Sequence, residues 1–84
     1  MTLKELCLMK DIKIVLDLDA RQNWIANIEP MLEVVDNGML TSTCGRGLGV
    51  GDALMNLCQQ ISGKRVRLSR GDPAERFDVP TVVL

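Results

Sequence analysis

The chain has 84 residues, which is enough for one folded domain spanning residues 1–84 and too few for two. A hydrophobic content of 46% excludes an intrinsically disordered chain, and a net charge of −1 excludes a general electrostatic attraction to nucleic acid or membranes. Because a domain of this size buries only a thin core and is marginally stable by itself, we expect a homodimer.

The first residues favour a short helix. The sequence TLKE at residues 2–5 has the form of a capping box, in which the two end residues accept hydrogen bonds from each other's backbone. Leu3, Leu6 and Cys7 then fall on one helical face. This pattern predicts a short N-terminal helix over about residues 3–10.

Two strands follow, because the apolar period changes to two. One face of the first strand carries Ile12, Ile14, Leu16 and Leu18. After a polar turn at residues 19–23, a second strand begins at Trp24 and ends before Pro30. We expect these two strands to form a hairpin.

A third strand is predicted after the next turn signal. Asn37-Gly38 accepts the positive φ values of a tight turn, and the strand then runs from Met39 to about Gly45. The preceding segment, residues 31–35, is a candidate to pair with it locally.

The strongest periodic pattern predicts the main helix at about residues 50–62. Its apolar positions recur at intervals of three and four, namely Val50, Ala53, Leu54, Leu57, Cys58 and Ile61. Gly49 suits the N-cap position and Gly63 the helix end. A fourth strand follows at Val66 and Leu68.

Together these elements predict an α+β domain in the order strand, strand, strand, helix, strand. We expect an antiparallel sheet of three to four strands with the main helix packed on one face.

The four alternating glycines before the main helix, Gly45, Gly47, Gly49 and Gly51, raise the question of a phosphate-binding loop. A P-loop needs Lys followed by Ser or Thr after its glycines, whereas Asp52 follows Gly51. A dinucleotide fingerprint needs a different glycine spacing within a βαβ unit. We therefore interpret the glycines as structural, because glycine lets the chain leave the strand in unusual backbone conformations and enter the helix. We expect no bound cofactor.

Catalytic and metal-binding chemistry has little support. The chain has no His, which removes Ser-His and Cys-His pairs and most zinc sites. The three widely spaced cysteines, Cys7, Cys44 and Cys58, suit reduced thiols in a cytoplasmic protein. Asp17 and Asp19 share a strand face and are the remaining candidate pair, but a solvated turn explains them better. We expect no enzymatic activity, no metal site and no membrane association.

Two groups of residues are candidates for binding. A basic cluster in the second half of the chain, Lys64, Arg65, Arg67 and Arg70, with Arg76 further along, would suit nucleic-acid phosphates. No aromatic residue lies among them for base stacking, and acidic neighbours dilute their charge. Candidate contacts to a partner protein are Trp24 and, in the glycine-rich loop, Arg46 and Leu48. Core burial is the alternative for Trp24.

Residues 12–62 resemble the antitoxin half of HicA–HicB toxin–antitoxin systems. The resemblance rests on the order of elements and on three segments, Ile28-Glu29-Pro30, residues 41–45 and Asp52-Ala53-Leu54. It implies a partial double-stranded-RNA-binding-type fold. The Pro-Glu-Leu-Pro-Gly segment typical of that family is absent, and Pro30-Met31-Leu32-Glu33 stands in its place.

Residues 23–80 also resemble small uncharacterised phage and prophage proteins. The matching segments are Asn23-Trp24, Pro30, residues 42–47, Ala53, residues 61–64 and residues 76–80. The resemblance implies a viral accessory role in the host cytoplasm and supplies no catalytic residues. From all of this we expect a non-enzymatic accessory protein that regulates or inhibits a partner protein by binding it. The alternative is a nucleic-acid-binding protein that uses the basic strand at residues 64–70.

Overall fold

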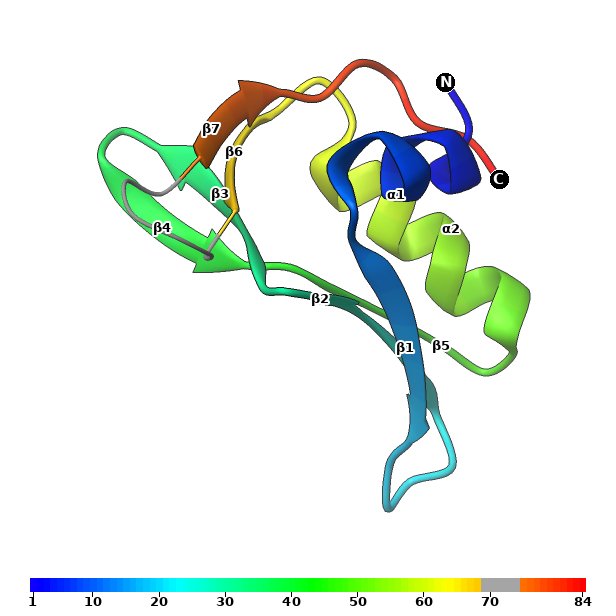
Figure 1. The fold of residues 1–84 in the computed structure, drawn as a ribbon. Helices are drawn as coiled ribbons and strands as arrows, with labels where there is room; N and C mark the ends of the chain where they lie inside the picture. Colours follow the sequence, from blue (N-terminus) through cyan, green and yellow to red (C-terminus); the bar gives the residue numbers. More distant parts are fainter. Residues whose placement is uncertain (69–74) are drawn as a thin grey trace.

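Figure 1 shows the computed structural model of the chain, which describes residues 1–68 and 75–84. The helices are α1 (Leu3–Lys10) and α2 (Val50–Ile61). The strands are β1 (Lys13–Leu18), β2 (Trp24–Glu29), β3 (Leu32–Asp36), β4 (Met39–Ser42), β5 (Cys44–Gly47), β6 (Arg65–Leu68) and β7 (Glu75–Asp78). The α+β class, the short N-terminal helix and the main helix are confirmed.

Helix α1 begins with the predicted capping box. The Thr2 hydroxyl accepts a hydrogen bond from the Glu5 backbone N–H at 3.1 Å, and the Glu5 carboxylate accepts one from the Thr2 N–H at 3.2 Å. Asp11, in the left-handed region at φ 53°, ends the helix. The chain ends lie together, because the Leu3 N–H donates to the Val83 carbonyl at 2.8 Å.

The first sheet is antiparallel in the order β1-β2-β5, with α2 packed on one face (Figure 1). In the register, Ala26 of β2 lies between Leu16 of β1 and Gly45 of β5. These cross-strand neighbours share the face that α2 covers, since a Cβ atom at Gly45 would meet the backbone of Ala53 in α2. The expected packing of the main helix on one sheet face is therefore confirmed.

The second sheet is antiparallel in the order β4-β3-β6-β7. Its hairpin turns at Asn37 and Gly38, whose φ values of 49° and 80° confirm the predicted tight turn. Strand β3 pairs with β4 on one side and with β6 on the other, so the segment before the turn does pair with the segment after it.

The strands divide over two sheets, whereas the sequence suggested a single one. The segment predicted as one strand from Met39 to Gly45 forms two, β4 and β5, which separate at Thr43. Thr43 is buried, and its hydroxyl donates to the Leu32 carbonyl at 2.8 Å. This hydrogen bond satisfies polar groups where the chain passes between sheets, so the crossing is accommodated inside the protein.

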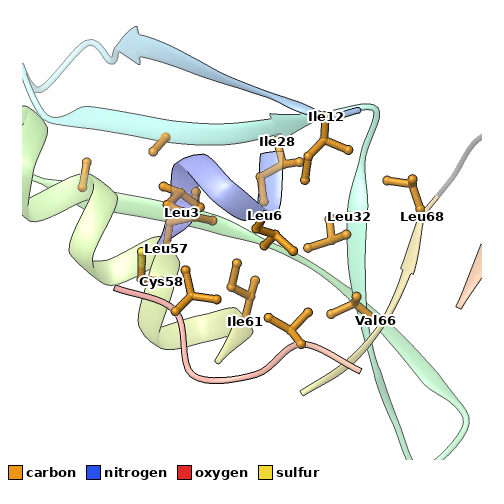
Figure 2. Close-up of a cluster of buried hydrophobic side chains, with 14 residues drawn as sticks. Leu3, Leu6, Ile12, Ile28, Leu32, Leu57, Cys58, Ile61, Val66 and Leu68 are labelled. Atoms are coloured by element: carbon orange, nitrogen blue, oxygen red, sulfur yellow. The ribbon is translucent and has the colours of Figure 1, made fainter. Parts of the chain in front are cut away.

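One buried cluster connects the two sheets, both helices and the C-terminal segment (Figure 2). The largest fully buried side chains come from the two helices and the second sheet, and they are Leu6, Leu32, Leu57, Ile61, Leu68 and Val66. Strand β1 adds no buried residue to this cluster. Its expected apolar face is largely open, since Leu16 is 38% exposed and Leu18 is 56% exposed.

Candidate protein-binding surface

Trp24 lies at one end of the first sheet, on its central strand. Its register partners are Leu18 of β1 and Gly47 of β5. The indole is half-buried and packs against the core cluster. Trp24 therefore combines the two predicted placements, because one part contacts the core while another part stays accessible at the sheet end.

Leu48 is the most exposed of the large hydrophobic residues in the described part of the chain, at 83%. It follows Gly47, which pairs with Trp24, so the two residues lie at the same end of the sheet. Leu18, 56% exposed, borders Trp24 on the other side. We call Leu18, Trp24 and Leu48 the apolar sheet end.

Arg46 lies near the apolar sheet end but on the other face. It pairs with Ile25, whose side chain alternates with that of Trp24, and it is exposed. The helices leave this face of the first sheet uncovered (Figure 1). The three predicted contacts thus gather at one end of the sheet, with Arg46 on its open face.

The alternating glycines are explained by the contact between β5 and α2. A Cβ atom at Gly45 would meet Ala53 and Leu57 of α2, and one at Gly47 would lie 2.5 Å from the Cβ atom of Asp52. Only residues without a side chain allow the helix to lie this close to the strand. The glycines at these two positions are therefore structural, but the expected reason was wrong. Neither Gly45 nor Gly47 has a positive φ, and close packing against α2 replaces the expected unusual backbone conformation.

The two carboxylates considered for catalysis, Asp17 and Asp19, have different surroundings. Asp19 is engaged in the turn after β1, where its carboxylate accepts hydrogen bonds from the backbone N–H groups of Arg21 at 2.8 Å and Asn23 at 2.9 Å. Asp17 is exposed on the open face and lines a depression that Asp19 does not line. Among residues 1–68 and 75–84, no three His, Cys, Asp or Glu side chains are grouped closely enough to hold a metal ion.

The three cysteines are free thiols. Cys58 is buried in α2, and burial raises its pKa above the ordinary 9.0. Burial likewise raises the pKa of the half-buried Cys7, which adjoins Cys58. A raised pKa keeps a thiol protonated and unreactive near neutral pH, as expected for small core residues.

The predicted basic cluster is partly brought together on the second sheet. Arg65 and Arg67 share one face of β6, and Arg76 of β7 pairs with Arg67. Each of the two arginines of β6 has an acidic neighbour on that face: the Asp78 carboxylate lies 3.5 Å from the Arg65 guanidinium, and Glu33 pairs with Arg67.

Two further members of the predicted cluster lie outside the strands of this sheet that the structure describes. Lys64 is exposed just before β6, and Arg70 lies outside the described residues. The only Phe of the chain, Phe77, alternates with Arg76 and therefore faces away from the arginines. Lys10 of α1 lies over the Phe77 ring, 4.1 Å from its centre.

The sequence did not indicate a second apolar surface, a groove between α1, β1 and α2. It is lined by Leu3, Lys4, Cys7, Ile14, Leu16, Leu54 and Leu84. Its only signal in the sequence was the apolar face predicted for the first strand. They line a groove because α2 lies over β5 and β2, away from the β1 edge.

No family model, no curated protein and no solved structure matches this chain. The resemblances to HicB-type antitoxins and to phage proteins therefore stay predictions. In the described part of the chain, neither helix has the length and apolar character needed to cross a bilayer.

Proposed function

We propose that this chain acts by binding another protein, as a non-enzymatic module that regulates or inhibits its partner. The observation that supports the proposal is the apolar sheet end, where Leu48 is 83% exposed beside the half-buried Trp24. Tryptophan that is anchored by its own fold and flanked by apolar side chains is typical of the residues that dominate protein interfaces. The accessory role implied by the phage-protein resemblance is compatible with such a module.

Substitution of Leu48 tests this proposal against a matched control. We expect Leu48→Asp to weaken partner binding by about tenfold or more, because a charge replaces an apolar contact at the centre of the interface. The control is Leu8→Asp, since Leu8 is a comparably exposed leucine, at 75%, on α1. The readout is the amount of partner that the tagged chain retains from nuclease-treated lysate of its source cell.

The two variants distinguish binding through the apolar sheet end from binding elsewhere. Loss of the same stoichiometric protein with Leu48→Asp, and its retention with Leu8→Asp, would support the apolar sheet end as the binding surface. Equal retention by both variants would contradict it.

Nucleic-acid binding is the second candidate, favoured by one observation. Arg65, Arg67 and Arg76 share a face of the second sheet, which is the arrangement that phosphate contacts need. Asp78 and Glu33 lie on the same face and offset part of this charge. Retention of nucleic acid alone, abolished by the double substitution Arg65→Ala and Arg67→Ala, would favour this candidate over protein binding.

A further inference from the structure

We propose that two copies of this chain associate through strand β1, edge to edge and antiparallel, about a two-fold axis at Val15. This inference goes beyond the proposed function, because it concerns pairing along the edge of β1, which shares only Leu18 with the apolar sheet end. It rests on the two edges of the first sheet, on the charges of β1 and on the groove beside it.

The β5 edge of the first sheet is already occupied by α2. The Gln60 side chain donates to the Cys44 carbonyl and accepts from the Cys44 N–H at 3.2 Å, which satisfies both backbone groups of that residue. One turn earlier, Asn56 donates to the Arg46 carbonyl. Side chains thus take the place of a neighbouring strand, and this edge cannot add one.

The β1 edge has no such cover. Strand β1 is six residues long and pairs with β2 along one side only. In the described part of the chain, no backbone hydrogen bond from a turn, loop or cap reaches residues 13–18. An open edge of this length is a template for a further strand.

The charges on β1 select a second copy as that strand. Lys13 and Asp17 lie on the open face, two positions either side of Val15. With the axis at Val15, Lys13 of each copy lies opposite Asp17 of the other, and the valines face each other. Opposite charges at directly facing positions stabilise an antiparallel pair.

Neighbouring registers lack this complementarity. An axis at Ile14 or at Leu16 places a charged side chain opposite Val15, and an axis at Asp17 places two aspartates opposite each other. Like charges at facing positions are destabilising, so the sequence of β1 specifies one register. Strand β4, at the edge of the second sheet, is four residues long and carries no charge that could specify a register.

The helix-side face of β1 supports the same axis. Ile14 of each copy would lie opposite Leu16 of the other, and Leu16 is 38% exposed in the single chain. Both residues line the groove between α1, β1 and α2, together with Leu54 and Leu84. Pairing therefore joins two apolar grooves across the seam and removes their side chains from water.

Charge reversal with mixing tests the proposal. Lys13→Asp alone places two aspartates opposite each other, and Asp17→Lys alone places two lysines opposite each other. In an equimolar mixture of these two variants, every facing pair is again of opposite charge. The readout is the dissociation constant of the dimer from sedimentation equilibrium, with circular dichroism as the check that each variant is folded.

We expect a dimer of the wild-type chain, a dimer about ten- to a hundredfold weaker for each variant alone, and recovery in the mixture. Because the mixture restores association, misfolding of a variant cannot produce this pattern. A wild-type chain that stays monomeric, single variants that dimerise as the wild type does, or a mixture without recovery would each overturn the proposal.

Discussion

The glycines of β5 lie close against α2. A Cβ atom at Gly45 would lie 2.5 Å from the Leu57 backbone nitrogen and would also meet Ala53. Gly51, in the first turn of α2, has nothing within 4 Å of its Cβ position. Gly45 therefore has no room for a side chain, whereas Gly51, six residues later, does.

This contrast gives a paired prediction. Gly45→Ala should lower the free energy of unfolding by about 1–3 kcal/mol or more, because the helix must shift away from the strand. Gly51→Ala should raise it by about 0.4–1 kcal/mol, because alanine restricts the unfolded chain and suits a helix. Urea denaturation of the two variants and the wild type measures both changes in the free energy of unfolding. An unchanged free energy of unfolding in Gly45→Ala would refute the close packing of α2 on β5.

Glu5 gives a prediction about pH. The Glu5 carboxylate accepts hydrogen bonds from the Thr2 backbone N–H and from the Thr2 hydroxyl. These bonds, the first more than the second, lower the pKa of Glu5 below the ordinary 4.5. A lowered pKa in the folded state means that the carboxylate stabilises the fold above its ordinary pKa, and that this contribution is lost as pH falls through the folded-state value.

We expect Glu5→Gln to reduce the melting temperature at neutral pH and to have a smaller effect in acid, where the wild-type residue is protonated as well. Thermal unfolding of the two chains across this pH range shows the difference. A difference that persists unchanged well below the folded-state pKa would mean that the ionised carboxylate is not what stabilises the capping box.

At the scale of elements, α2 makes two kinds of contact. One face of the helix packs in the core, and the neighbouring side-chain amides form hydrogen bonds to the edge of β5. Ala53, Leu57 and Ile61 have no exposed area, whereas Asn56 and Gln60 reach the backbone of β5. The apolar spacing of the sequence predicts the packing in the core. The hydrogen bonds to the β5 edge depend on the short distance between helix and strand, which Gly45 and Gly47 allow.

The edge cover can be measured separately from the core. Gln60→Ala should lower the free energy of unfolding by about 1–2 kcal/mol, because both backbone groups of Cys44 lose their partner. Gln59→Ala is the matched control, since Gln59 is an exposed neighbour on the same helix, and it should change stability by less than about 0.5 kcal/mol. Equal effects of the two substitutions in urea denaturation would show that Gln60 does not protect the edge.

At the scale of the whole molecule, local patterns predicted local structure. The capping box at Thr2, the tight turn at Asn37-Gly38 and the spacing of Leu57 and Ile61 each depend on a few neighbouring residues, and the corresponding elements form as expected. The gathering of Trp24 and Leu48 at one sheet end was not predicted, because it depends on the pairing of β2 with β5.

The division into two sheets was not predictable in this way. It depends on a hydrogen bond between Thr43 and Leu32, eleven residues apart, and nothing in the sequence distinguishes Thr43 from an ordinary strand residue. The alternating apolar residues of β1 likewise predicted a strand with one apolar face, but not how far that face is buried, because burial depends on where α2 crosses the sheet. Local periodicity does not predict arrangements that depend on contacts between residues distant in the sequence.

The central claim is that this chain binds a protein through the apolar sheet end and not nucleic acid through its arginines. The most direct test measures the affinity for the captured partner as the salt concentration rises. An apolar protein interface predicts an affinity that changes little. Contacts of Arg65, Arg67 and Arg76 with phosphates predict instead that the logarithm of the binding constant falls with a slope of about −2 to −3 against the logarithm of salt concentration, and that slope would contradict the account.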